Sequence, residues 1–130
     1  MAGEPLLIVD DNATNLKLVR VLLEGAGYEV RVALDADEAL EMLRAFRPRL
    51  ILMDIQLPGM DGLSLTRMLK ANPSMRDIII VGLTAYAMKG DEERIRAAGC
   101  DGYIAKPLDT RTLPANVAAY LNGTGHGGAE

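Results

Sequence analysis

The sequence predicts an α/β fold of the flavodoxin-like, doubly wound (βα)5 type, a three-layer sandwich with a parallel sheet in the order 2-1-3-4-5. Strand-like and helix-like segments alternate along the 130 residues with short connections. Several strand-like segments are apolar at every position, which is typical of parallel strands buried on both faces. Five such units joined by right-handed crossovers give this architecture.

The first unit begins with an apolar run at residues 6–9, which ends at Asp10 and Asp11. We predict a buried strand there. Asn12 can cap the following helix, whose apolar residues recur at helical spacing, and Gly25 ends it.

The second unit begins at residues 28–32, where apolar and charged side chains alternate. This pattern indicates a strand nearer the edge of the sheet. Asp35 with Glu38 resembles a capping box, so a helix should begin there and extend to Phe46. Pro48 then ends the helical region.

The third unit is the stretch LILMDIQLPGMDG at residues 50–62. Its first four residues predict a buried strand, and Asp54 stands directly at the end of that strand. A carboxylate beside a buried segment costs free energy unless a partner or a function compensates. Asp61 can cap the next helix, which Asn72 and Pro73 close.

Two further units complete the predicted sheet, and their strands end at Thr84 and Lys106. The predicted strands and helices lie at residues 78–83, 89–98, 102–105 and 112–121. We expect one domain over residues 1–122 and a flexible, Gly-rich tail at residues 123–130, in which His126 is solvated.

Composition excludes several classes of function. A net charge of −4 argues against direct nucleic-acid binding, because a phosphate backbone requires clustered positive charge. Apolar runs stay well below the ~20 residues of a membrane span, and the N-terminus does not resemble a signal peptide, so we expect a cytoplasmic protein without a membrane segment. The single cysteine, Cys100, is expected to be a small buried apolar residue.

Polar residues that end the central strands should meet at one edge of the sheet. They are Asp10, Asp11, Asp54, Thr84 and Lys106. Singly, each acid is more often a helix cap or a turn residue. Together, three carboxylates at adjacent strand ends would repel one another unless a cation lay between them. Oxygen ligands favour Mg²⁺, and the spacing of acids in an EF-hand, which would favour Ca²⁺, is absent from the sequence.

A phosphoryl group is the natural ligand for such an edge. A dinucleotide or flavin phosphate is disfavoured, because the turn DDNATN carries two acids in place of glycines. A carboxylate can instead act as a nucleophile toward a phosphoryl group. Lys106 could then pair with phosphoryl oxygens or form a salt bridge to an acid, and Thr84 could donate a hydrogen bond.

These residues, in this order, resemble the receiver domain of two-component response regulators, typified by the single-domain chemotaxis regulator. The resemblance covers about residues 6–121, and departures from the family pattern, such as Leu57 before Pro58, are small. The motifs that carry it are Asp10-Asp11, Asp54 followed by LPGMDG, Thr84-Ala85 and Lys106-Pro107.

The resemblance implies that Asp54 accepts a phosphoryl group from a phosphohistidine on a histidine kinase or a phosphotransfer protein. Asp10, Asp11, Asp54 and the backbone carbonyl of Gln56 would hold Mg²⁺, and Lys106 would pair with the phosphoryl group. The protein would be a phosphoacceptor that assists its own phosphotransfer and dephosphorylation, rather than an enzyme acting on an external substrate.

The resemblance also implies a conformational switch. Thr84 would move toward the phosphoryl group and Tyr103 would turn into the vacated space, altering the face of the fourth helix, fifth strand and fifth helix where a downstream partner docks. The Lys106-Pro107 bond would be cis. The protein would be a monomer or a weak, phosphorylation-dependent homodimer.

Two alternatives remain at this point. A small Mg²⁺-dependent phosphatase with an aspartyl nucleophile would use similar residues, but it would place its nucleophile in a D-x-D pattern where this chain has Asp10-Asp11-Asn12. A constitutive interaction module would leave the acidic cluster unexplained. No output domain follows Leu121 in the sequence, so we expect the chain to act by docking or to be part of a longer regulator.

Overall fold

A computed structural model gives the fold and describes residues 3–85, 89–106 and 108–123. The predicted cis bond at Lys106-Pro107 involves a residue outside these ranges, and so does His126 with the tail from residue 124 onward.

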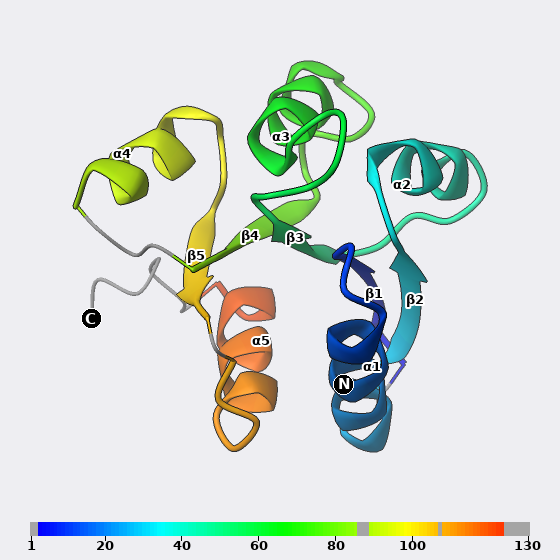
Figure 1. The fold of residues 1–130 in the computed structure, drawn as a ribbon. Coiled ribbons are helices and arrows are strands. Elements are labelled where there is room, and N and C mark those ends of the chain that lie inside the picture. The colour runs from blue at the N-terminus through cyan, green and yellow to red at the C-terminus, as the bar shows by residue number, and fades with distance from the viewer. Residues whose placement is uncertain (1–2, 86–88, 107, 124–130) are drawn as a thin grey trace.

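Five parallel strands form one sheet in the order β2-β1-β3-β4-β5, which confirms the predicted topology. The strands are β1 (Pro5–Val9), β2 (Glu29–Ala33), β3 (Leu50–Asp54), β4 (Ile79–Thr84) and β5 (Gly102–Ala105). The helices are α1 (Ala13–Gly25), α2 (Ala36–Leu43), α3 (Gly62–Ala71), α4 (Lys89–Ala97) and α5 (Leu113–Leu121). Figure 1 shows α2, α3 and α4 on one face of the sheet and α1 and α5 on the other.

Each face of the sheet carries its own hydrophobic core, because successive side chains of a strand point to opposite faces. In β1, Leu7 and Val9 pack into the core beneath α2, α3 and α4, and Leu6 and Ile8 pack into the core beneath α1 and α5. All four side chains are buried, which explains the continuous apolar run in the sequence.

The three predicted N-caps are confirmed by their hydrogen bonds. Asn12, Asp35 and Asp61 each accept a hydrogen bond from the backbone N–H three residues later, at 3.0, 2.8 and 2.8 Å. Glu38 completes the first turn of α2 by accepting from the backbone N–H of Leu34, at 2.7 Å. These bonds satisfy donors that the first turn of a helix leaves without partners.

The predicted end of the second helix was wrong. The helix was expected to reach Phe46, but α2 ends at Leu43. The next residues form tighter turns, in which the backbone N–H groups of Arg44 and Ala45 bond to carbonyls three residues earlier. Phe46 is half-buried against the core and its ring lies under the guanidinium of Arg31, 4.7 Å from the ring centroid.

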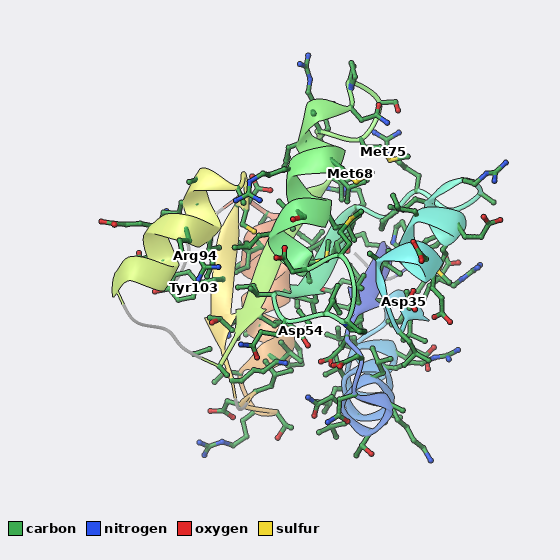
Figure 2. All side chains as sticks on the ribbon, turned by 45° about the horizontal axis from the view of Figure 1, so that its top comes forward. Asp35, Asp54, Met68, Met75, Arg94 and Tyr103 are labelled. Atoms are coloured by element: carbon green, nitrogen blue, oxygen red, sulfur yellow. The ribbon has the colours of Figure 1, made fainter. Side chains whose placement is uncertain are left out.

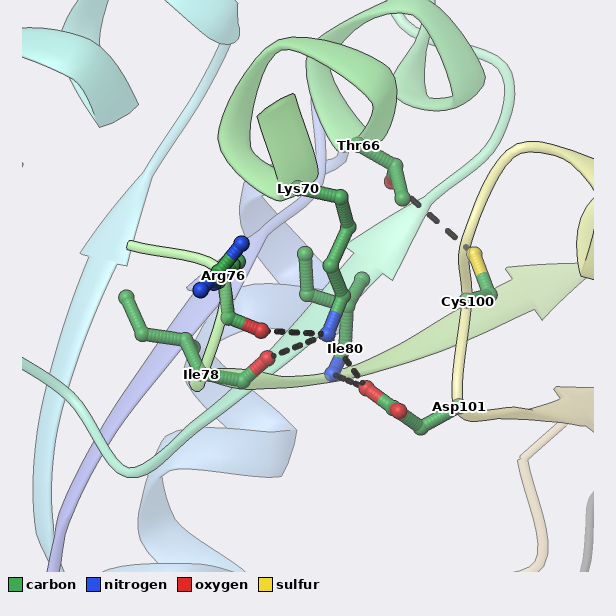
Figure 3. A network of polar contacts seen from close by, with 7 residues as sticks. All are labelled: Thr66, Lys70, Arg76, Ile78, Ile80, Cys100 and Asp101. Atoms are coloured by element: carbon green, nitrogen blue, oxygen red, sulfur yellow. Dashed lines mark hydrogen bonds and ion pairs between the residues drawn. The ribbon is translucent and has the colours of Figure 1, made fainter. Parts of the chain in front are cut away.

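A polar network fastens α3 to the turn before β5 (Figure 3). Lys70 Nζ donates to the carbonyls of Arg76 and Ile78, at 3.1 and 2.9 Å, and pairs with Asp101 Oδ2 at 2.9 Å. The same carboxylate oxygen accepts from the backbone N–H of Ile80 at 2.8 Å. The network therefore joins the end of α3, the start of β4 and the α4–β5 turn.

Cys100 is buried beside this network, as predicted. Its Sγ lies 3.9 Å from Thr66 Oγ1, and burial raises the pKa of its thiol to about 11. In the described part of the chain, the helices are all too short or too polar to span a membrane.

Candidate functional site

Three carboxylates meet at the carboxyl edge of the sheet, where the sequence predicted a cluster. Asp10 and Asp11 follow β1 and Asp54 ends the neighbouring strand β3. One oxygen from each of the three lies within 4.8 Å of the others. Asp10 and Asp54 are only 2% and 3% exposed, whereas Asp11 is exposed. Figure 2 labels Asp54 at this edge.

The local backbone holds the two buried carboxylates in place. The backbone N–H of Asn12 donates to Asp10 Oδ1 at 2.9 Å, and that of Gln56 donates to Asp54 Oδ1 at 3.0 Å. In each case the donor lies two residues after the acid, so each side chain accepts a hydrogen bond from the turn that follows its own strand. In both acids the second oxygen, Oδ2, faces the ammonium of Lys106.

Gly62 allows the start of α3 to approach Asp54 closely. Its backbone N–H donates to the carbonyl of Ile55 at 2.9 Å. A Cβ on this residue would lie 2.1 Å from the backbone oxygen of Asp54, closer than real Cβ atoms come to any neighbour. The absence of a side chain at Gly62 is therefore a condition for the observed position of Asp54.

Lys106 supplies the positive charge of the site. Its Nζ lies 3.1 Å from Asp54 Oδ2 and 3.8 Å from Asp10 Oδ2. Its backbone N–H donates to the carbonyl of Thr84 at 2.7 Å, which links β5 to the end of β4. The salt-bridge alternative for Lys106 is therefore realised in this structure.

Asp54 has a raised pKa, and the causes act in both directions. Burial raises the pKa of this carboxyl most strongly, and the charge of Asp10 adds to the increase. The backbone N–H of Gln56 and the ammonium of Lys106 lower it, but they do not cancel the effect of burial. The hydrogen bond from Gln56 and the charge of Lys106 therefore do not fully offset the cost of burying the ionised carboxylate of Asp54.

The donor set of the cluster fits a hard divalent cation. With all three acids ionised, three carboxylates and one ammonium carry a net charge of −2, which a divalent ion balances. All of these donors are carboxylate oxygens, the ligands that Mg²⁺ prefers. Asp11 and Gln56 both line a cavity of about 520 Å³ beside the cluster.

Thr84 and Tyr103 lie on neighbouring strands near the cluster. Thr84 ends β4, is buried and lines the same cavity. Tyr103 is half-buried on β5 and packs against the core beneath α2, α3 and α4. Its backbone carbonyl accepts a hydrogen bond from the hydroxyl of Tyr120 on α5, at 3.4 Å. The roles of both residues in a switch remain predictions.

Arg94 is a lining residue of the site region that the sequence analysis did not single out. It lies on α4, where Figure 2 labels it. It lines the cavity together with Asp11, Gln56 and Thr84. The sequence shows only a charged helix at this point, and its pattern does not tell which charged side chain faces the site.

Comparison with known proteins decides the family. The family model for the response regulator receiver domain matches residues 6–118. The chain belongs to this family. Receiver domains of response regulators are phosphorylation-activated signalling switches that interact with kinases or phosphotransfer proteins. The comparisons give no support to the alternative of a small phosphatase.

Curated relatives of this receiver domain include the polar-differentiation response regulators DivK of Brucella anthropi and Brucella ovis. Each is 47% identical over 116 residues, a match that covers 89% of this chain and 94% of the relative. The similarity therefore extends over nearly the whole of both chains.

Solved structures of receiver domains share the fold. A putative response regulator from Chloroflexus aurantiacus has 34% identity and a TM-score of 0.87, covering 92% of this chain and 98% of that chain. The chemotaxis response regulator CheY4 of Vibrio cholerae has 27% identity and a TM-score of 0.85, with 90% and 98% covered. The receiver domain of a Pseudomonas aeruginosa sensor histidine kinase has 35% identity and a TM-score of 0.83, with 93% and 99% covered, and holds a magnesium ion in its active site cleft.

Proposed function

We propose that Asp54 is the phosphoacceptor of this receiver domain and takes its phosphoryl group from a phosphohistidine on a histidine kinase or a phosphotransfer protein. The observation that carries this proposal is the position of Asp54 at the end of β3, where its carboxylate lies within 4.8 Å of those of Asp10 and Asp11 and 3.1 Å from the ammonium of Lys106. A carboxylate oxygen of Asp54 would form the new bond to phosphorus, and the bond from phosphorus to the imidazole nitrogen of the donor would break.

Asp10, Asp11, Asp54 and the backbone carbonyl of Gln56 are the proposed ligands of Mg²⁺. The three clustered carboxylates and their net charge of −2 with Lys106 support this assignment. When bound, the ion would neutralise charge that accumulates on the phosphoryl oxygens. Lys106 would exchange its present contact with Asp54 for one with the phosphoryl group.

Thr84 and Tyr103 are the proposed switch residues. Thr84 would donate its hydroxyl proton to a phosphoryl oxygen, and Tyr103 would turn inward as Thr84 moves. The half-buried position of Tyr103 and the hydrogen bond from Tyr120 to its carbonyl support a connection between β5 and α5. The face formed by α4, β5 and α5 would then present a different surface to a downstream protein.

The wider setting follows from the family. We propose that residues 1–122 form the receiver domain of a cytoplasmic protein that does not bind nucleic acid directly. The protein would assist its own phosphorylation and dephosphorylation, and it would be a monomer or a weak homodimer that forms on phosphorylation.

Phosphorylation by a small donor tests the proposal. The protein is incubated with acetyl phosphate in the presence or absence of Mg²⁺, and its intact mass is measured. Wild type should gain one phosphoryl group only with Mg²⁺, and Asp54→Asn should gain none. Asp35→Asn is the matched control, because Asp35 caps α2 and is not among the described residues that line the cavity beside the acidic cluster.

Two results would contradict the proposal. One is an undiminished adduct on Asp54→Asn, which would assign the phosphoryl group to another residue. The other is steady release of phosphate from varied phosphate monoesters, which would favour a phosphatase over a stoichiometric acceptor.

A further inference from the structure

The cavity of about 520 Å³ beside the acidic cluster lies where the loop after β3 faces α4. Its lining includes both residues of the candidate site and apolar residues. The residues concerned are Asp11, Gln56, Thr84, Ile55, Leu57 and Ile95. Its volume is many times the ~30 Å³ that one water molecule occupies in the liquid, so a small organic molecule fits in it, beside Asp11 and Gln56.

Arg94 gives this cavity a positive charge. It is the single basic residue among the lining residues in the described part of the chain, where Asp11 and Asp61 are the acids. Lys106 instead lines a second cavity, of about 550 Å³, together with Ala85 and Leu18. The ammonium and the guanidinium therefore border the site from different sides.

We propose that Arg94 selects the phosphodonor by binding the acyl group of a small acyl phosphate. The inference rests on the proposed role of Asp54 as phosphoacceptor. An oxygen of Asp54 forms a bond to phosphorus, and the bond from phosphorus to the acyl oxygen breaks. The electron pair of that bond stays on the acyl oxygen, so the leaving group is a carboxylate.

The chemistry of the leaving group matches the side chain. The planar guanidinium of an arginine can donate two parallel hydrogen bonds to a carboxylate. In an in-line displacement the leaving group departs on the side opposite the attacking oxygen. Negative charge grows on the leaving group during the step, and the cavity beside the cluster is lined by Arg94 together with apolar residues that fit an alkyl group.

Two donors with different leaving groups test this role. Acetyl phosphate releases acetate, whereas phosphoramidate releases ammonia, which carries no negative charge. Second-order rate constants for phosphorylation are measured by intact mass for wild type, Arg94→Ala, Arg94→Lys and Arg96→Ala. Arg96 is the matched control, because it lies on the same helix, pairs with Glu92 at 3.1 Å and is not among the cavity-lining residues in the described ranges.

Arg94→Ala should slow phosphorylation by acetyl phosphate about tenfold, the scale of one charge-assisted hydrogen bond, and should change the rate with phosphoramidate less than about twofold. Arg94→Lys keeps the charge and should lose less. Arg96→Ala should match wild type with both donors. Thermal unfolding of each variant shows whether the fold is intact.

Three outcomes would overturn the role of Arg94: no loss with acetyl phosphate, an equal loss with both donors, or the same loss in Arg96→Ala. A wild type that reacts with neither donor would instead refute the proposed function of Asp54, and the role of Arg94 with it. The two failures are distinguishable. A failure of the role of Arg94 appears only in the variants, whereas a failure of the role of Asp54 already appears in wild type.

Discussion

The close approach of α3 to Asp54 makes Gly62→Ala a sharp perturbation of the site. A Cβ at this residue would lie 2.1 Å from the backbone oxygen of Asp54 and 2.9 Å from the Cα of Ile55. Real Cβ atoms stay at least 3.0 Å from such neighbours, so α3 and the end of β3 must separate by about 1 Å. Both neighbours are backbone atoms, which cannot turn away as a flexible side chain can.

The expected cost follows from this overlap. Overpacking that displaces backbone costs about 1–3 kcal/mol, which for a domain of this size lowers Tm by about 4–12 °C. Because the displaced backbone belongs to Asp54, we also expect phosphorylation by acetyl phosphate to slow about tenfold or more. Thermal unfolding and intact-mass kinetics measure the two effects.

Gly25→Ala is the matched control for this prediction. Gly25 ends α1, and no atom lies within 4 Å of the Cβ that alanine would add. Alanine should leave the protein as stable or stabilise it by about 0.5–1 kcal/mol. The reasoning would be refuted if Gly62→Ala unfolded at the same temperature as Gly25→Ala and was phosphorylated at the wild-type rate.

Three further predictions concern stability and reactivity. Because burial raises the pKa of Asp54, the native state binds this proton more tightly than the unfolded state. Without divalent cations, the unfolding free energy of wild type should therefore fall relative to that of Asp54→Asn as pH rises from about 4 through the raised pKa. Urea denaturation with EDTA up to about pH 8 measures this difference, and a difference that stays constant or grows in favour of wild type as pH rises would contradict the prediction. Lys70→Met should destabilise the protein by about 2–3 kcal/mol, because two backbone carbonyls lose their side-chain donor and Asp101 loses its ion-pair partner. Arg67→Met, at an exposed residue of the same helix, should change stability by less than about 0.5 kcal/mol, and equal denaturation midpoints would refute the role of the network. Cys100 should react slowly with a thiol reagent in the native protein and quickly in denaturant, since burial raises the pKa of its thiol to about 11; rapid native labelling would contradict its buried position.

The sequence was sufficient to predict the architecture and the acidic cluster, because both depend on local patterns. A continuous apolar run marks a strand buried on two faces, and the residue after it must lie at the carboxyl edge of the sheet. Asp10 and Asp54 could be brought together in this way, since parallel neighbouring strands end at the same edge. The helix caps were equally local, each spanning three residues.

What the sequence did not predict depends on distances between elements. The pairing of Lys70 with Asp101 joins residues 31 positions apart, and neither has a pattern that points to the other. The cavity beside Arg94 exists only because α4 packs opposite the loop after β3. The early end of α2 at Leu43 was missed because Arg44 and Ala45 have no helix-breaking chemistry of their own.

Chemical mapping of the phosphorylated residue tests the central proposal most directly. The protein is phosphorylated with acetyl phosphate and Mg²⁺ and reduced with borohydride, which converts an aspartyl phosphate into homoserine. Peptide sequencing by mass spectrometry then locates the homoserine. The account predicts homoserine at Asp54 and unmodified aspartate at Asp10, Asp11 and Asp61. Homoserine at any of these three, or at none of the four, would contradict it.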